Sequence, residues 1–401
     1  MSFVATGLKS TEEYSYIDTN NIAENRGMKL FKTVGIYGAN ASGKSNIIRA
    51  LNWFVSAIIT QPSPQSNFVF LCDPFLYQKD SKNTESFFQI VLLIEGIKYR
   101  YGFTVKRNLE TNVEKDNNFS REIVTNEWLY TSKSEVMYPR FERTNDEVIT
   151  NNLENKDKVP ANIPYKHTLF LAHAASFDSK GDCSKVFSYL NIIPISIYQQ
   201  LFRSLSISHL KNTENKQSFL HLLSIFNLKY DDIILQEDSK IDKAKIFPQE
   251  KVLLEKQYES IKIFLNLKDN ESSGTQKLFD LAGLLLYAFN FFSLIIVLDE
   301  IDSNFHPSLL IKLIGLFNNP EINKMNSQLL FTSHDTNLMS PSIMRRDQFY
   351  FTEKNEDDST RLYSLADLKG VQNDADFAKQ YLAGFYGALP ILEEYRQEDR
   401  L

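Results

Sequence analysis

The sequence of 401 residues predicts an α/β fold with an antiparallel β subdomain and a helical insertion. Three observations predict it. A glycine-rich segment, residues 38–45, lies between a short apolar run and a segment with the apolar spacing of an amphipathic helix. In the middle of the chain, two alternating segments flank Glu95-Gly96, as the strands of a hairpin do. Later, residues 281–298 change from a helix-like to a β-branched, strand-like apolar composition.

The composition indicates a folded, soluble chain, with 43% apolar and 23% charged residues. A net charge of −6 argues against a surface built as a whole for nucleic acid. Cys72 and Cys183 have no metal-binding spacing, which favours a reducing, cytoplasmic location. The chain start has no secretory signal. Because residues 281–298 divide into a helix and a strand, we expect no membrane span there.

The elements follow one another in a regular order. We expect a strand over 33–37, a helix after residue 44, strands over 87–94, 99–105 and 123–130, and a helix over 307–317 followed by strands over 328–332 and 348–352. Residues 61–85, 106–120 and 142–165 are polar and read as loops. Residues 167–267 read as helical, including SFLHLLSIFNL and EKVLLEKQYESIKIFLNL. The predicted divisions are an N-terminal lobe with the glycine-rich segment (1–60), the β subdomain (61–165), the helical insertion (166–268) and a C-terminal lobe (269–401).

The strongest motif is GANASGKS at residues 38–45, a full match to G-x-x-x-x-G-K-[ST]. Such a loop presents backbone N–H groups to phosphate oxygens, so its side chains stay small. The lysine adds a positive charge for the β- and γ-phosphates, the final serine a Mg²⁺ ligand, and the following helix its N-terminal dipole. The residues predicted to bind ATP here are Gly38, Asn40, Ala41, Ser42, Gly43, Lys44, Ser45 and Asn46, with Ser45 also on Mg²⁺.

A second motif is the apolar strand at 294–298 that ends in Asp299-Glu300. After such a strand, the first carboxylate is suited to Mg²⁺ and the second to polarising the attacking water. An apolar run before two acids is weak evidence alone, but it becomes specific beside the glycine-rich loop. We therefore predict Asp299 as a metal ligand and Glu300 as a catalytic residue.

A third motif, Ser273-Gly274-Thr275-Gln276, opens the helix that leads to Asp299. It resembles the S-G-G-Q core of the ABC ATPase signature, with Thr275 in place of the second glycine. On this interpretation Ser273, Gly274 and Gln276 bind ATP held by another subunit, through the helix N-terminus. The alternative is an ordinary serine N-cap on a core helix.

A fourth motif, Ser333-His334, ends the strand at 328–332. In that position His334 matches the switch histidine of ABC ATPases, which contacts the γ-phosphate, although a helix-capping serine with an incidental histidine is the alternative. Gln78 is a candidate for the Mg²⁺-linked glutamine of this class. Gln61, Gln65 and Gln89 lie nearby in the sequence and leave that assignment open.

Taken together, the motifs resemble the RecF/SMC/OLD-like branch of ABC ATPases, whose fold is the P-loop NTPase of ABC/SMC-head type. More narrowly, the chain is similar to the stand-alone ATPases of bacterial anti-phage defence operons: RloA, the abortive-infection AbiL ATPases and the AriA subunit of PARIS systems. The phrases that carry the similarity are GANASGKSN (38–46), KYRYGF (98–103), NEWLY (126–130), ESSGTQKLF (from 271), LDEIDSNFHP (from 298), FTSHD (from 331), RRDQFYF (from 345) and YLAGFYGALP (381–390).

The resemblance implies an ATP- and Mg²⁺-dependent hydrolase that forms a homodimer, or a higher homo-oligomer, with ATP sandwiched between subunits. It also implies a sensor or scaffold that controls a separately encoded effector, such as a nuclease, and a DNA or phage-protein trigger. The alternative is a RecF-type repair or recombination ATPase that clamps DNA. OLD-type relatives carry a C-terminal nuclease, for which the stretch after His334 is short, so we expect the effector on another chain.

The effector surface is predicted in the section 167–267, since it carries aromatic residues of the type favoured at interface centres. These are Tyr198, Phe202, Phe219, Phe226 and Tyr230. The alternative is that they fill the core between helices.

Overall fold

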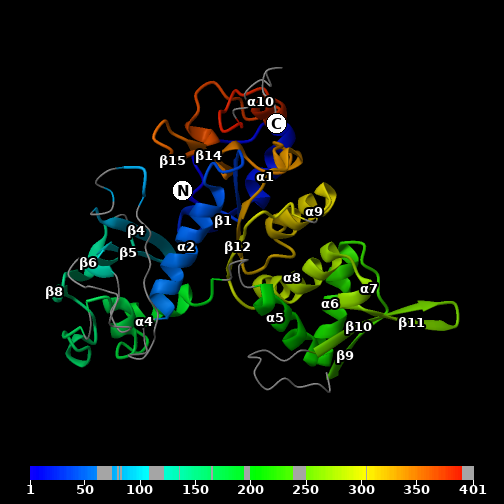
Figure 1. The fold of residues 1–401 in the computed structure, drawn as a ribbon, viewed down its shortest axis with the longest axis horizontal. Coiled ribbons are helices and arrows are strands. Elements are labelled where there is room, and N and C mark those ends of the chain that lie inside the picture. Colours follow the sequence, from blue (N-terminus) through cyan, green and yellow to red (C-terminus); the bar gives the residue numbers. More distant parts are fainter. Residues whose placement is uncertain are drawn as a thin grey trace, which may run out of the picture. The chain divides into compact units, whose positions relative to one another are not determined.

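The computed structural model describes residues 1–60, 75–78, 81, 84–107, 122–134, 136–163, 166–193, 199–237, 250–303 and 305–390. By its contacts the chain separates into two compact units (Figure 1). Unit 1 consists of Met1–Lys44, Pro194–Glu353 and Leu362–Leu401, and unit 2 of Ser45–Ile193 and Lys354–Arg361. The four divisions made from the sequence stay a prediction.

Unit 1 is built on a five-stranded sheet with the order β12-β13-β3-β14-β15. Its strands are β3 (Thr33–Gly38), β12 (Ile295–Leu298), β13 (Gln328–Thr332), β14 (Phe349–Lys354) and β15 (Thr360–Ser364). The central strand β3 pairs in parallel with β13 and β14, and β12 pairs in parallel with β13. All six residues of β3 are buried, as expected of a strand covered on both faces. This confirms the predicted α/β fold with the glycine-rich loop at a strand end.

Two long helices pack beside this sheet, α8 (Ser273–Asn290) and α9 (Pro307–Asn318). The rings of Phe289 and Phe317 meet edge to face where these helices contact each other. The apolar stretch 281–298 is therefore the end of α8 followed by β12, as predicted. Among the described residues, no helix combines the length and apolar composition that crossing a membrane requires.

Helices α5 (Gln199–Lys211) and α6 (Thr213–Ile225) pack on α8. The approach of α5 to α8 is close, because a Cβ on Gly283 would lie 2.4 Å from the Cα of Ser206. The Ser206 hydroxyl accepts from the Gly283 N–H at 2.9 Å. In this region Phe202, Phe219 and Phe226 are buried, with exposed fractions of 3%, 0% and 4%. They fill the core between helices, so the prediction that they form an exposed surface is wrong; Tyr198 lies outside the described residues.

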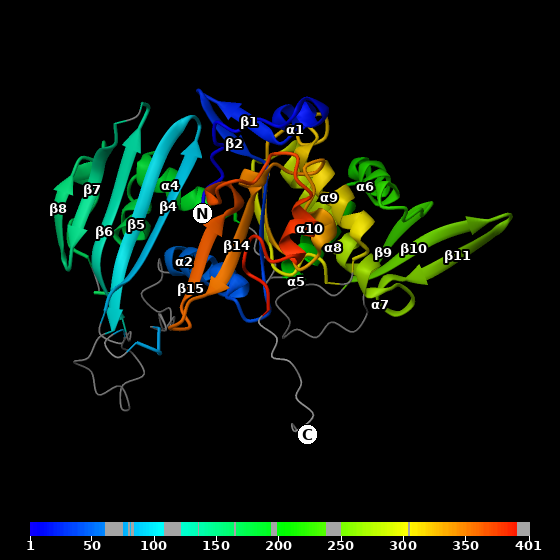
Figure 2. The same cartoon turned by 90° about the horizontal axis from the view of Figure 1, so that it is seen from above.

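The section predicted to be helical up to residue 267 also contains strands. A three-stranded antiparallel sheet comprises β9 (Asp232–Glu237), β10 (Glu250–Tyr258) and β11 (Ile261–Asn266). The segment EKVLLEKQYESIKIFLNL is thus a β-hairpin and not a helix, and in Figures 1 and 2 it extends beyond α6 and α7 (Leu267–Asn270). The other α-helices and strands described in unit 1 are α1 (Ser15–Asn20), the hairpin β1 (Ile22–Asn25) and β2 (Met28–Phe31), and α10 (Phe377–Leu382).

Unit 2 contains a second, antiparallel five-stranded sheet with the order β4-β5-β6-β7-β8. Its elements are α2 (Lys44–Ile59, of which Ser45–Ile59 lies in this unit), β4 (Ser86–Ile94), β5 (Ile97–Arg107), β6 (Glu122–Ser132), β7 (Tyr138–Thr144), β8 (Glu147–Asn151), α3 (Phe170–Ala175) and α4 (Asp182–Leu190). The Glu95-Gly96 hairpin and the strand after residue 122 are confirmed. Residues 138–151, read from the sequence largely as loop, form a further hairpin.

One face of the unit 2 sheet is covered by helices, which Figure 2 shows for α4. From α2, Phe54 stacks on Phe103 with ring centroids 5.3 Å apart. From α3, Phe170 meets Phe141 edge to face. Beneath α3, the fully buried Glu127 accepts from the N–H groups of Phe170 and Leu171 at 2.6 and 2.8 Å.

Glu127 forms a buried ion pair with Arg143, whose nitrogen lies 3.3 Å away. Burial raises the pKa of Glu127, while Arg143 and the helix N–H groups act against that rise. This pair holds α3 to the sheet of unit 2.

Candidate active site

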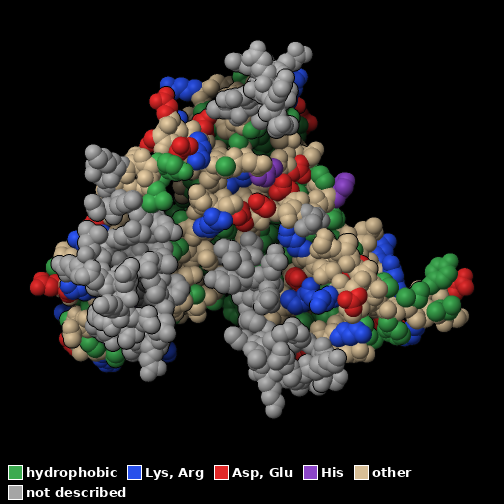
Figure 3. Space-filling view, viewed as in Figure 1, with side chains coloured by type: hydrophobic (Ala, Val, Ile, Leu, Met, Phe, Trp, Pro, Cys, Tyr) green, Lys and Arg blue, Asp and Glu red, His purple; other side chains and the backbone are tan. Residues whose placement is uncertain are grey.

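Three predicted motifs follow the carboxyl ends of adjacent parallel strands. The glycine-rich loop follows β3, Asp299-Glu300 follows β12, and Ser333-His334 follows β13. Since β13 pairs with both β3 and β12, the three loops emerge at the same edge of the sheet. Ligands of open α/β sheets bind at this edge. Figure 3 shows acidic, basic and histidine side chains gathered near the centre of the view.

The glycine-rich loop needs the residue types at its turns. Gly38 has a φ of 152° and Gly43 one of 108°, which L side chains rarely adopt. A Cβ on Gly38 would lie 2.5 Å from the carbonyl oxygen of Thr352 in β14. The buried Ser42 hydroxyl lies 2.6 Å from the Thr352 hydroxyl. The loop is thereby fixed against β14, with Asn40 and Ala41 exposed at its tip.

Lys44 folds its side chain back over this loop. The Lys44 Nζ donates to the carbonyl oxygens of Gly38 and Ala39 at 2.8 and 2.9 Å, and Lys44 as a whole is 6% exposed. Burial lowers the pKa of Lys44, whereas the nearby carboxylates of Asp299, Asp302 and Glu300 favour the charged form. The ammonium group is therefore held between the loop and the acidic strand ends, where a phosphate chain would need it.

Thr332 joins the acidic motif to the neighbouring strand. Its buried hydroxyl donates to Asp299 Oδ1 at 2.5 Å and accepts from the Glu300 N–H at 2.7 Å. Glu300 has a φ of 49°, in the left-handed region, and its side chain is exposed. The backbone turns sharply at this residue, so its carboxylate projects from the sheet edge while Asp299 stays half-buried.

Asp302 links the same turn to His334. The Asp302 carboxylate accepts from the His334 N–H at 3.0 Å, and the His334 ring is exposed. Burial raises the pKa of Tyr37, and the nearby carboxylates of Asp335 and Asp302 raise it as well. Through Asp302 the turn after Glu300 sets where the backbone of His334 lies.

The first turn of α8 has an ordinary helix cap, and next to the cap lies an exposed serine. Ser272 is the N-cap: its hydroxyl accepts from the Thr275 N–H at 3.2 Å. Thr275 is buried and its hydroxyl lies 3.0 Å from that of Ser272, whereas Ser273 is exposed. Gln276 donates to the carbonyl oxygens of Lys268 and Glu271. The capping role belongs to Ser272, which leaves the Ser273 side chain at the helix start for another role.

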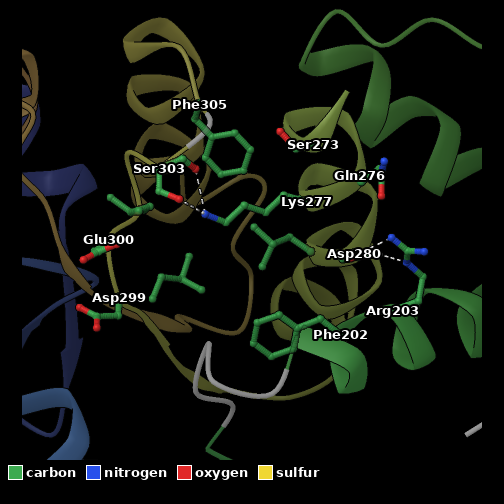
Figure 4. A pocket seen from close by; sticks show the side chains of 13 residues that line it. Phe202, Arg203, Ser273, Gln276, Lys277, Asp280, Asp299, Glu300, Ser303 and Phe305 are labelled. Carbon is green, nitrogen blue, oxygen red and sulfur yellow. Dashed lines mark hydrogen bonds and ion pairs between the residues drawn. The ribbon is translucent and has the colours of Figure 1, made fainter. Parts of the chain in front are cut away.

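A cavity of about 410 Å³ lies between α5, α8 and the loop after β12. In Figure 4, Asp299 and Glu300 lie on one side of it and Ser273 and Gln276 on the other. Arg203 of α5 forms an ion pair with Asp280 of α8 at the far wall. The residues of the glycine-rich loop do not line this cavity, so it is distinct from that loop.

Comparison with known proteins decides the family. The family described as "AAA domain, putative AbiEii toxin, Type IV TA system" matches residues 34–340. The chain belongs to this family. The match extends from β3 to beyond His334 and so includes all four motifs. No curated protein matches the chain.

Solved structures similar to this family member include SMC heads. The SmcHead bound to the C-winged helix domain of ScpA has 14% identity and a TM-score of 0.37, covering 85% of this chain and 93% of that one. The SMC head domain from Thermotoga maritima has 15% identity and a TM-score of 0.35, covering 83% and 90%. UvrA2 from Deinococcus radiodurans has 17% identity and a TM-score of 0.23, covering 49% and 22%.

In this family member the acidic residue directly after β12 is of a type that suits Mg²⁺. Mg²⁺ prefers hard oxygen ligands and is commonly held by one or two protein groups together with substrate phosphates. The half-buried Asp299 carboxylate offers such an oxygen, and Ser45, half-buried in the first turn of α2, offers a hydroxyl. Within the described ranges, no group of three or more His, Cys, Asp or Glu could form a dedicated metal cage.

Gln78, the candidate for a glutamine at Mg²⁺, has a hydrogen-bond partner in its own unit. It is exposed, and its amide donates to Asp357 at 2.9 Å, both within unit 2. Its role at Mg²⁺ stays a prediction. The neighbouring candidates Gln61 and Gln65 lie outside the described residues, and Gln89 is exposed on β4.

Four residues of the site were not singled out from the sequence: Thr332, Asp302, Thr352 and Lys277. Three of them, Thr332, Asp302 and Lys277, lie within a few residues of one of the four motifs. Adjacency to a motif is a usable signal for Thr332, Asp302 and Lys277. Thr352 has no such signal, because its contact with Ser42 depends on the pairing of β14 with β3.

Proposed function

We propose that the chain is an ABC-type ATPase that binds ATP with Mg²⁺, hydrolyses it, and dimerises around it. The observation that supports this best is the convergence of three loops at the carboxyl edge of one sheet. The loop over Gly38–Lys44 suits a triphosphate, and Asp299 and Glu300 stand at the end of β12, which β13 separates from β3. Thr332 bonds both acidic residues, which ties the hydrolytic group to the strand beside the phosphate loop.

Each residue has a defined part in the proposed hydrolysis. The loop N–H groups and Lys44 hold the β- and γ-phosphates and stabilise the charge that develops on them. Mg²⁺, when bound, would neutralise the phosphate oxygens, with Ser45 and Asp299 as its protein ligands. Glu300 orients the attacking water and accepts its proton. His334 contributes a donor to the γ-phosphate from the next strand end.

The proposed dimer explains the exposed start of α8. A helix N-terminus with unsatisfied N–H groups is a site for an anion. Ser272 satisfies one N–H by capping, while the exposed Ser273 and the half-buried Gly274 remain at the same end. We therefore propose that Ser273, Gly274 and Gln276 contact ATP held by a second copy of the chain, which makes each site depend on two subunits.

For the biological role, we propose a defence ATPase that controls a separately encoded effector. The family description refers to an AbiEii toxin and a type IV TA system, which supports a role in abortive infection. Phe202, Phe219 and Phe226 are buried, so these aromatic residues do not form the effector surface. Four exposed apolar side chains of that section lie on the β10–β11 hairpin: Tyr258, Ile261, Ile263 and Phe264.

The catalytic proposal is tested by two substitutions with a control. Lys44→Ala should abolish ATP binding, because the loop loses its side-chain charge. Glu300→Gln should keep ATP binding, stop turnover and accumulate an ATP-bound dimer, visible by light scattering. Glu321→Gln, at an exposed acid after α9, serves as the matched control and should behave as the unmodified protein. Undiminished hydrolysis by Glu300→Gln would remove Glu300 from the mechanism.

The biological proposal is tested separately. A tagged chain should co-purify with the product of a neighbouring gene, and deletion should change the outcome of phage infection. If the chain purifies alone with every neighbour, infection is unaffected, and duplex DNA stimulates its ATPase activity, then a RecF-type repair ATPase replaces the defence role.

A further inference from the structure

The Lys277 side chain crosses from α8 to the loop that follows Glu300. Its Nζ donates to the Ser303 carbonyl oxygen at 2.9 Å and lies 3.4 Å from the Ser303 hydroxyl. The same ammonium lies 5.0 Å from the centroid of the Phe305 ring, a cation–π contact. Figure 4 shows this side chain reaching across the cavity toward the loop. One lysine therefore holds two points of the loop.

The loop held by Lys277 is the one that sets the catalytic groups. The Ser303 N–H donates to the Glu300 carbonyl oxygen at 3.0 Å, which closes a turn between these residues. The Glu300 N–H is bonded to Thr332, and Asp302 in the middle of the turn accepts from the His334 N–H. A shift of Ser303 thus displaces the turn that orients Glu300 and the backbone of His334.

The other end of this connection lies in the first turns of α8. Lys277 follows Gln276 directly, four residues after Ser273. A purely structural lysine would hold α8 to the loop and contribute to folding alone. Burial lowers the pKa of Lys277, and the carboxylates of Asp302 and Glu300 oppose this, so the ammonium is held close to the acidic turn. That placement connects the helix start with the hydrolytic groups of the same subunit.

We propose that Lys277 is a positioning residue that transmits contact at the start of α8 to Glu300 and His334 of its own subunit. When a nucleotide on a second copy seats against Ser273, α8 and the Ser303 turn move together through the Lys277 bond, and hydrolysis becomes dependent on that contact. This inference rests on the proposed ATPase function.

The experiment compares ATP binding and turnover in the full-length chain. Lys277→Met keeps the length of the side chain and removes its charge. We expect kcat to fall tenfold or more, the factor that about 1.4 kcal/mol represents, with Kd for ATP within about twofold. Lys277→Arg should recover much of the kcat, since a guanidinium can donate to the same carbonyl. Ser303→Ala should have less than about a twofold effect, because the shorter bond is to the backbone.

A control and a second measurement separate positioning from folding. Lys312→Met, at an exposed lysine of α9, should change neither kcat nor Kd. In the absence of ATP, hydrogen exchange at the amides of Ser303 and His334 should be faster in Lys277→Met, with the melting temperature nearly unchanged. If Lys277→Met melts early, Lys277→Gln is measured in its place.

The two proposals fail in different ways. If the unmodified chain does not hydrolyse ATP, the proposed function fails and the inference fails with it. If the unmodified chain hydrolyses ATP and Lys277→Met has the same kcat and the same exchange at His334, the ATPase stands and the positioning role is refuted. An equal loss in Lys277→Arg and Lys277→Met would likewise refute a role for the ammonium bond.

Discussion

Thr332→Val tests how the sheet holds the acidic motif. Thr332 is 0% exposed, and its hydroxyl makes two bonds, to Asp299 Oδ1 and from the Glu300 N–H. Valine has nearly the same shape, so the change removes the hydroxyl and leaves little cavity. Asp299 then loses a donor, and the Glu300 N–H loses its acceptor in a turn where φ is 49°.

The expected loss follows from these two bonds. A hydrogen bond to a charged group contributes about 1.5–3 kcal/mol and a neutral one about 0.5–1.5 kcal/mol. Their sum is about 2–4.5 kcal/mol of unfolding free energy, and water that reaches the half-buried Asp299 favours the lower end, about 2 kcal/mol. For a unit of this size, a loss of about 2 kcal/mol lowers the melting temperature by about 4–8 °C. We also expect kcat to fall about tenfold to a hundredfold, since Glu300 loses its fixed backbone.

The assay combines thermal unfolding with steady-state ATP hydrolysis. Thr332→Ser is the matched variant, because it keeps the hydroxyl and loses a methyl group, and it should retain most of the kcat. If Thr332→Val melts within about 1 °C of the unmodified chain and turns over normally, the hydroxyl does not organise the acidic motif and the reasoning is refuted.

Three further changes have defined outcomes. Gly38→Ala should weaken ATP binding at least tenfold by calorimetry, since its Cβ would lie 2.5 Å from the Thr352 carbonyl oxygen; an affinity within twofold would contradict this. Arg143→Met should cost about 3–5 kcal/mol in urea unfolding, because Glu127 stays buried without its cation. Burial already raises the pKa of Glu127, and the loss of Arg143 should raise it further. The stability lost in Arg143→Met should therefore be largest above the pKa of Glu127 and should shrink as the pH falls through it. A loss of stability that does not change with pH would contradict this. Ser273→Arg should block hydrolysis and leave ATP binding by one subunit intact. Normal turnover in this variant would show that Ser273 has no role in hydrolysis and that α8 is an ordinary core helix.

The sequence predicted best those features in which local chemistry decides the outcome. The loop over Gly38–Lys44 requires backbone angles that glycine provides, and the structure has positive φ at Gly38 and Gly43. The Glu95-Gly96 turn was readable for the same reason, with Gly96 at a φ of 74°. The switch from α8 to β12 was visible because the apolar residues become β-branched after residue 294.

The errors arose where tertiary contacts decide. The β10–β11 hairpin turns at Glu259-Ser260, with Glu259 at a φ of 53° and no glycine or asparagine to indicate it. Without a turn signal, the spacing of the charged residues in this segment fits a helix as well as it fits two strands. The hairpin of β7 and β8 turns at Asn145, which has a φ of 49°, so a usable signal was present there. Burial of Phe219 depends on its packing against Phe279 of α8, which no local pattern contains.

The parallel pairing of β3 has a consequence for the order in which the chain is synthesised. This strand leaves the ribosome early, yet its two neighbours in the sheet, at residues 328–332 and 349–354, are made near the end. All of unit 2 up to Ile193 is translated while β3 has no partner. Pairing over such a separation is slow, and an exposed apolar strand favours aggregation during the delay. A nascent chain halted before β13 therefore lacks one partner strand of β3, and the sheet edge from which the glycine-rich loop emerges stays incomplete.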